Sequence, residues 1–232
     1  ASKSRGLGDV YKRQMLYRGA AGDNTLHRHA SVQICQSDTP LSMVDASGTT
    51  IRGCALLVRP DAPHQLLPVA RLTLLLIEPQ SALGQSWLRQ AGDTDIYQLP
   101  ESEHLDLSLS LPELNSQLHR ATKVYAAQLD PRLDRALDYI HGQPLNGAVA
   151  RAAEHAGISV SRLRTLATQQ LGVPLSKWAL WQAIRISAQS ALSMSLAEAA
   201  LAGGFADQAH FTRSARKLFG LTPTELVRAA TT

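Results

Sequence analysis

The stretch GGFADQAHFTRSARKLFG, residues 203–220, decides the fold of the C-terminal half of this protein. At about 100° per residue, a helix over this stretch would bury one apolar face and expose a basic one. The face expected to be buried consists of Phe211, Ser214, Ala215, Leu218 and Phe219. The face expected to be exposed consists of Ala209, Thr212, Arg213, Arg216 and Lys217, with His210 at the border. A single helix of this kind is usually an ordinary solvated surface, so its meaning depends on the rest of the chain.

The start of this helix is marked by Asp207, a residue type that caps helix N-termini. The exposed first turn is then Gln208, Ala209 and His210, with backbone amides that point outward. A helix tip of this kind beside arginines is suited to phosphate groups and base edges.

An internal repeat places the stretch in context. Ala153-x-x-x-Gly157 is matched about 47 residues later by Ala200-x-x-x-Gly204. Each copy continues into a longer helix that closes with an apolar residue, a glycine and a nearby proline. The alanine allows close helix packing and the glycine allows a turn with positive φ, so each copy is predicted to be a helix-turn-helix.

The first copy predicts a less basic exposed face than the second. Its buried face is expected to be Leu163, Leu166, Ala167 and Leu171. Its exposed face is expected to be Ser161, Arg164, Thr165, Thr168 and Gln169. A helix over about residues 175–191 would separate the two copies by ~25 Å, comparable with one turn of DNA. Trp178 and Trp181 on this helix are interpreted as packing anchors.

Charge divides the chain in the same way. Residues 131–232 carry 11 Lys and Arg against 6 Asp and Glu, whereas residues 15–130 carry 8 against 12. The basic C-terminal half favours an anionic partner, and together with the repeat it favours DNA binding over a plain solvated surface.

Length and composition predict two domains without a membrane span. The chain has 232 residues, 44% of them hydrophobic, and no run of 18 uninterrupted apolar residues. Cys35 and Cys54 form no CxxC pair, which favours a reduced, cytoplasmic protein in which both are buried hydrophobic residues. Residues 1–14 read as a non-native or disordered leader.

The N-terminal half predicts an antiparallel β-barrel or sandwich over residues 15–80. The short apolar or alternating runs SVQIC, LSMV, CALLV and RLTLLLIE are separated by turn-forming segments. Residues 81–130 are predicted to be a helical connector that can serve dimerisation, with a helix over SALGQSWLRQ and a loop over LPESEHLDLSLSLPE. An apolar stripe on one further helix is expected from Leu114, Leu118, Tyr125 and Leu129. Residues 131–232 are predicted to be the double helix-turn-helix domain, which makes the fold class α+β.

The segment from about residue 131 to 229 resembles the AraC/XylS family of bacterial transcription regulators. The second motif, SLAEAALAGGFADQAHFTRSARKLFGLTPTELVR, is highly specific for it. The resemblance implies two helix-turn-helix units that read successive major-groove segments of promoter DNA. The positions it implies as base-reading are Ser161, Arg164 and Thr165 in the first unit and Gln208, Ala209, His210 and Arg213 in the second, with Arg216 and Lys217 on the same basic face. Thr165 stands where an Arg is common and Ala167 where a large aromatic is common, so the first unit is expected to be the weaker reader.

The N-terminal half resembles the cupin-like sensor domain of the same family through HRHASVQ and RPDAPHQL. His27 and His29 share one face of a strand, and His64 from a later strand can converge on them. Gln33 occupies the place where metal cupins carry a carboxylate, which weakens a divalent site. Three interpretations stay open: an effector pocket lined by these four residues, a metal site of the three histidines, and structural histidines.

The preferred function is a non-enzymatic, sequence-specific DNA-binding transcription regulator, modulated by an unknown small effector in the N-terminal barrel. A homodimer is expected, and no cofactor is. One alternative is a metal-dependent cupin enzyme with an accessory helical domain. The other is a DNA binder whose barrel only dimerises.

Overall fold

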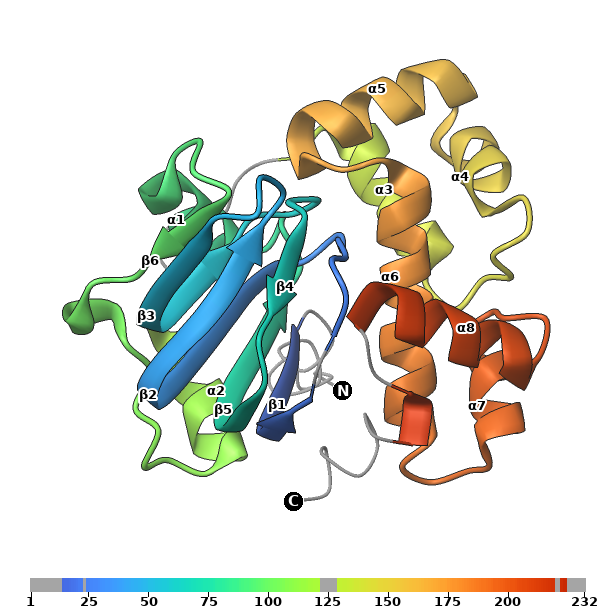
Figure 1. Ribbon diagram of the computed structural model, residues 1–232. Coiled ribbons are helices and arrows are strands. Elements are labelled where there is room, and N and C mark those ends of the chain that lie inside the picture. Colours follow the sequence, from blue (N-terminus) through green and yellow to red (C-terminus); the bar gives the residue numbers. More distant parts are fainter. Residues whose placement is uncertain (1–13, 23, 122–128, 220–221, 225–232) are drawn as a thin grey trace, which may run out of the picture.

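The protein is described by a computed structural model over residues 14–22, 24–121, 129–219 and 222–224 (Figure 1). An antiparallel sheet and its two covering helices form the N-terminal part, and a group of helices forms the C-terminal part. The strands are β1 (Gln14–Ala21), β2 (Val32–Asp45), β3 (Thr50–Val58), β4 (His64–Leu66), β5 (Val69–Ile77) and β6 (Ile96–Gln98). The helices are α1 (Ala82–Ala91), the 3-10 turn η1 (Glu101–Glu103), α2 (Leu111–Ala121), α3 (Pro131–Ile140), α4 (Ala148–Ala156), α5 (Val160–Leu171), α6 (Leu175–Ser190), α7 (Leu196–Ala202) and α8 (Gln208–Phe219). None of the helices in these ranges has the length and hydropathy needed to cross a membrane.

The sheet is open, so the α+β class is confirmed but the expected closed barrel is wrong. The strand order is β1-β5-β2-β3-β6, with β4 paired to β2 beside this path. Within the described residues, no pairing joins the edge strands β1 and β6. Closure would require both edges to pair, and barrels of this kind use about eight strands.

The long strand β2 replaces the two separate strands expected from SVQIC and LSMV. Its register with β3 shifts between Gln36 and Leu41, which marks an irregularity that bends the strand. The first half of β2 pairs with β5 and the second half pairs with β4. The bend therefore allows β2 to pair with β5 along its first half and with β4 along its second half, and β4 lies next to the loop that precedes β2.

Strand β1 was not anticipated by the sequence. It pairs along β5, from Gln14 opposite Ile77 to Ala21 opposite Val69. The predicted leader, residues 1–14, overlaps this strand at Gln14, and its residues 1–13 lie outside the described residues.

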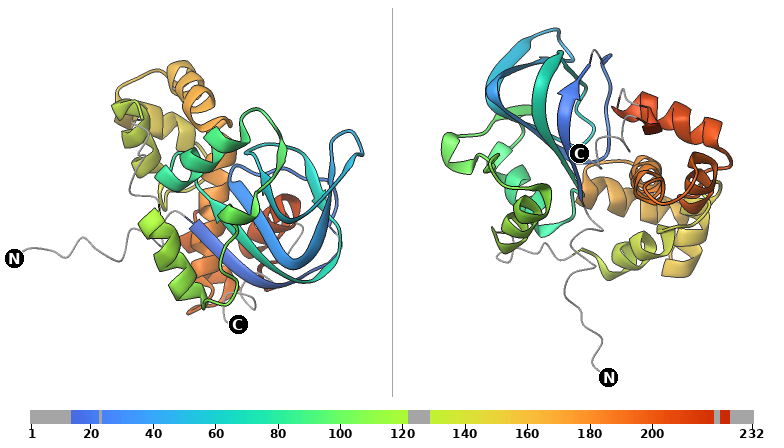
Figure 2. Two further views of the ribbon diagram at one scale, coloured as in Figure 1. Left: turned by 90° about the vertical axis from the view of Figure 1, so that its left-hand side faces the viewer. Right: turned by 90° about the horizontal axis from the view of Figure 1, so that it is seen from below.

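The two faces of the sheet pack against different helices. Successive side chains of β5 pack on opposite faces of the sheet. Leu75 and Ile77 pack with α1 and α2, whereas Leu74 and Leu76 pack with the C-terminal helices. Figure 2 shows α1 and α2 on one side of the sheet and the C-terminal helices on the other. This is the period-two alternation of a strand that is buried on both faces.

The predicted connector, residues 81–130, packs on the sheet and contributes a strand to it. Residues Ile96–Gln98 form β6 and pair with β3. The predicted helix over SALGQSWLRQ is confirmed as α1, and Leu114 and Leu118 of α2 are buried with it. The prediction that Leu129 belongs to the same apolar stripe is wrong, because Leu129 packs with the C-terminal helices. Tyr125, the remaining residue of the predicted stripe, lies outside the described residues.

Helix α6 joins the C-terminal helices to the sheet. Trp178 and Trp181 are 1% and 0% exposed, which confirms them as packing anchors. The Trp178 indole also donates to the Gln80 side-chain oxygen, at 3.3 Å. The core that contains both tryptophans includes Leu76 of β5 and Ala30 of the loop before β2, so the two halves of the molecule share one hydrophobic cluster.

A buried polar network crosses the same interface. The Glu78 carboxylate, 2% exposed, accepts hydrogen bonds from the side chains of Gln80 and Gln182. Gln182 in turn accepts from Arg185 at 2.8 Å, and Arg185 contacts the His141 ring. Buried polar groups require such partners, so these contacts fix how α6 sits on the sheet.

Candidate functional site

Two helix-turn-helix units lie at opposite ends of α6, as the repeat predicts (Figure 1). The first consists of α4 and α5 and the second of α7 and α8. The turns contain Gly157 with φ +69° and Gly204 with φ +91°, which confirms that these glycines adopt conformations that other residues rarely adopt. Helix α6 has 16 residues, which corresponds to ~24 Å of rise.

The second unit presents the predicted basic face. The predicted inner residues Phe211, Ala215 and Leu218 are buried, and Ser214 is 9% exposed. The outer side chains that lie exposed are Gln208, Ala209, Arg213, Arg216 and Lys217. The exposed side of α8 therefore carries three cationic side chains, those of Arg213, Arg216 and Lys217.

The first turn of α8 differs from the expectation in one respect. Asp207 accepts a hydrogen bond from the His210 backbone amide at 2.6 Å, which confirms it as the capping residue. The His210 amide is therefore not free for a phosphate. The His210 ring packs edge-on against Phe205 at 5.0 Å between ring centroids, which leaves it half-buried.

The first unit also has the predicted inner and outer faces. Its buried residues include Leu163, Leu166, Ala167 and Leu171, and Ser161, Arg164, Thr165, Thr168 and Gln169 are exposed. The hydroxyl of Thr165 donates to the Ser161 carbonyl, and that of Thr168 to the Arg164 carbonyl, both at 3.1 Å. These hydroxyl protons are used inside the helix, so Arg164 is the main outward donor among the three predicted readers.

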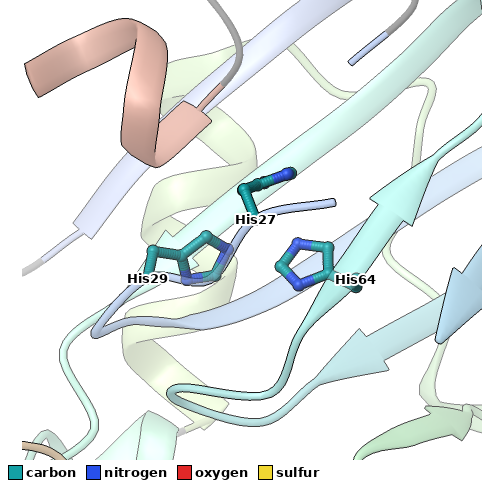
Figure 3. A group of neighbouring side chains, drawn as sticks. All are labelled: His27, His29 and His64. Atoms are coloured by element: carbon teal, nitrogen blue, oxygen red, sulfur yellow. The ribbon is translucent and has the colours of Figure 1, made fainter. Parts of the chain in front are cut away.

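Three of the four predicted effector residues form a compact imidazole cluster, in which His27, His29 and His64 face one another (Figure 3). One candidate ligand atom from each ring lies within 4.8 Å of the other two. His29 and His64 are 1% and 0% exposed, and His27 is half-buried at the rim. The backbones of His27 and His64 exchange both amide hydrogen bonds, at 2.9 and 3.0 Å, which holds the loop against β4.

Burial keeps these imidazoles neutral. Desolvation lowers the pKa of His29 to about 4, with the nearby His27 as a second cause. Desolvation also holds the pKa of His64 well below its usual value, followed by repulsion from His29 and His27. The pKa of His27 is lowered by burial as well. Neutral imidazoles can act as hydrogen-bonding groups or as metal ligands.

Gln33 completes the group of four. Its side-chain oxygen lies 2.7 Å from Nε2 of His29, and its amide nitrogen donates to Sγ of Cys35 at 3.2 Å. Gln33 is 4% exposed, so these contacts orient its side chain in the interior. The four side chains thus lie together in the structure, while their role in binding an effector or a metal stays a prediction.

The sequence did not indicate how this site meets α6. Asp61 follows Pro60 and has φ +63°, and Lys177 of α6 donates to its carboxylate at 2.5 Å. The Asp61 amide also donates to the carbonyl oxygen of His29 at 2.8 Å. Asp61 and Lys177 are separated by 116 positions, so no local pattern could pair them.

Comparison with known proteins agrees with this architecture. Residues 152–229 match the helix-turn-helix domain family. The arabinose operon regulatory protein of Escherichia coli (strain K12) is 33% identical over 129 residues, which cover 53% of this chain and 44% of that protein. The chain therefore spans less than half the length of this curated relative.

Solved structures of ToxT from Vibrio cholerae have the same overall fold. The structure from strain O395 aligns with a TM-score of 0.58 over 95% of this chain and 99% of that one, at 12% identity. Wild-type ToxT of strain SCE256 bound to an unsaturated fatty acid aligns with a TM-score of 0.58 over 94% and 95% of the two chains, at 11% identity.

The fold and the paired units define a protein with an N-terminal sheet domain and two helix-turn-helix units. Residues 152–229 are thus similar to the helix-turn-helix domain of AraC-type proteins, of which the arabinose operon regulatory protein is one example.

Proposed function

We propose that this protein is a sequence-specific DNA-binding transcription regulator whose affinity for promoter DNA is modulated by a small effector in the N-terminal domain. The observation that carries the proposal is the pair of exposed helix faces on α5 and α8, held at the two ends of α6. Helix α6, which lies between them, rises ~24 Å over its 16 residues, and one turn of DNA is roughly 34 Å.

The exposed residues supply two kinds of contact. Arg213 on α8 and Arg164 on α5 can each donate two hydrogen bonds to the O6 and N7 acceptors of guanine. Gln208 on α8 can donate one hydrogen bond to N7 of adenine and accept one from its N6 amino group. Arg216 and Lys217 lie in the last turn of α8, where they can neutralise phosphates. The more basic face on α8 supports the second unit as the stronger reader.

The effector half of the proposal is supported by the shared interface between the sheet and α6. A ligand can shift DNA affinity only if it favours one arrangement of the two halves. ToxT, which has the same fold, has been solved with an unsaturated fatty acid bound. A homodimer and a cytoplasmic location remain predictions, and light scattering of the purified protein tests the first.

Selection from a random duplex pool tests the function. The full chain is expected to enrich a motif with two separated half-sites, and the best site should bind ~10³-fold or more tightly than random DNA. Substitution of both Arg164 and Arg213 by Ala should abolish enrichment. Binding of equal strength to every duplex would contradict sequence-specific regulation.

The metal-dependent enzyme is the second candidate function, and the match of residues 152–229 to the helix-turn-helix domain family argues against it. Metal binding by the histidines would not by itself favour an enzyme, because a bound ion can equally act as an effector.

A further inference from the structure

The geometry points to a binding site for a divalent transition-metal ion at His27, His29 and His64, with the Gln33 amide oxygen as a fourth ligand, and to this ion as the effector. The regulatory role of the ion rests on the proposed function. The site itself rests on the contacts of the four side chains.

Two of the rings are oriented in the way that metal-binding imidazoles are. Nδ1 of His27 faces the Thr25 carbonyl oxygen and Nδ1 of His64 faces the Ala62 carbonyl oxygen, both at 2.9 Å. A carbonyl only accepts, so both Nδ1 atoms carry the proton and each Nε2 has a lone pair. Nδ1–H held by a backbone carbonyl is the arrangement that orients metal-binding imidazoles.

The second ring nitrogen of His64 is orphaned. Its Nε2 is buried without a hydrogen-bond partner in the described part of the chain, on a side chain that is 0% exposed. Leaving such an acceptor unpaired in the interior costs about 1–3 kcal/mol. A cation among the three rings would satisfy it.

His29 can adopt both required tautomers, because Ser31 offers a donor and an acceptor to the same nitrogen. Nδ1 of His29 lies 3.0 Å from the Ser31 hydroxyl and 3.1 Å from the Ser31 carbonyl oxygen. Without an ion, Nε2–H donates to Gln33 and the hydroxyl donates to Nδ1. With an ion, the proton resides on Nδ1, which donates to the carbonyl, and Nε2 becomes a ligand.

The size and chemistry of the site select the ion. Zinc–imidazole bonds of about 2.0–2.1 Å require ligand nitrogens ~3.4 Å apart, so the present spread of up to 4.8 Å must close by little more than ~1 Å. His27 at the rim can supply this movement. The ring centroids of the three histidines lie 4.4–5.9 Å apart. Three neutral imidazoles and an amide oxygen favour zinc, cobalt or nickel over magnesium or calcium.

The route from the ion to the DNA-binding helices is short. Asp61 donates its amide to the His29 carbonyl, and the next residue, Ala62, accepts from the His64 ring. The Asp61 carboxylate binds Lys177 of α6, the helix that carries both helix-turn-helix units. Closing the rings around an ion therefore shifts the residue that holds α6.

The test uses the metal-free full chain, with Co²⁺ absorption and Zn²⁺ competition as readouts of binding. Wild type is expected to bind one ion per chain. His64→Ala and His27→Gln are expected to lose affinity by about 100-fold or more, and the exposed-site control His155→Gln is expected to bind as wild type. His27 lies at the rim, so its variant remains informative if His64→Ala fails to fold.

The regulatory part is read from DNA affinity with and without Zn²⁺. Zn²⁺ is expected to change the wild-type Kd for the selected site by roughly fivefold or more. Asp61→Asn is expected to bind Zn²⁺ normally and to lose this change, an outcome that a purely structural role of Asp61 would not produce. If the wild-type protein binds DNA selectively but binds no metal, the metal-site inference is overturned and the proposed function stands. If it binds metal but its DNA affinity does not change, the effector role of the ion is overturned.

Discussion

The backbone amide of Leu145 donates to the carbonyl oxygen of Gly204 at 3.0 Å, which joins the loop before the first helix-turn-helix to the turn of the second. A Cβ at Gly204 would lie 2.3 Å from the carbonyl oxygen of Gln143 and 3.3 Å from Cα of Pro144. Gly204 thus serves both as a turn residue and as a point of close backbone contact between the two units.

Gly204→Ala is expected to lower the free energy of unfolding by about 2–4 kcal/mol, because it combines positive-φ strain with a backbone clash. Gly157→Ala is the matched control, since Gly157 has φ +69° and a Cβ added there would meet no atom within 4 Å. The control should cost only about 1 kcal/mol. Urea unfolding of both variants measures the difference, and equal losses would show that the contact with Gln143 does not matter.

The Asp61–Lys177 ion pair is expected to contribute modestly to stability, because the two side chains are 25% and 36% exposed. A double-mutant cycle of Asp61→Asn and Lys177→Gln should give a coupling energy of about 0.2–1 kcal/mol. Asn tolerates the positive φ of position 61, so the change isolates the charge. The cycle of Arg59 and Asp93, a pair with a fully exposed carboxylate, is the control. A coupling no larger than in that control would remove Asp61 as a link to α6.

Arg213 and Lys217 are expected to differ in their contributions to DNA binding. Arg213→Ala should cost ~1–3 kcal/mol on the selected site and relax the preference for one base, because an arginine in the groove reads base edges. Lys217→Ala should weaken binding to all duplexes alike and reduce the slope of affinity against salt. Titrations on matched and mismatched duplexes at several salt concentrations separate the two. Uniform losses from both variants on every duplex would refute this division.

The two cysteines are expected to differ in reactivity. Burial raises the pKa of the Cys35 thiol to about 12, so the reactive thiolate is scarcely populated at pH 8. Cys54 is half-buried rather than fully buried, contrary to the sequence expectation. Brief alkylation of the native protein, read by peptide mass spectrometry, should modify Cys54 and spare Cys35. Full unfolding should make both react, and rapid native labelling of Cys35 would contradict its burial.

The sequence by itself determined the helical half in detail. Helix periodicity separated the buried Phe211 and Leu218 from the exposed Arg213 and Lys217, and the glycines of the repeat marked both turns. These features are local, since a helix places residues three and four apart on one face whatever surrounds it. The sequence also led us to expect that His27, His29 and His64 converge, but the expected strand under the first two is wrong, because both lie in the loop before β2.

Only the tertiary structure decided the features that depend on distant segments. The bend in β2, the open edges of the sheet and the pairing of β1 with β5 arise from contacts between strands far apart in sequence. The tautomers of the histidines depend on carbonyls that only the folded loop supplies, and the link from His29 through Asp61 to Lys177 spans more than half the chain. Side-chain periodicity fixes which face of an element is buried, but which partner covers that face is set by packing of the whole molecule.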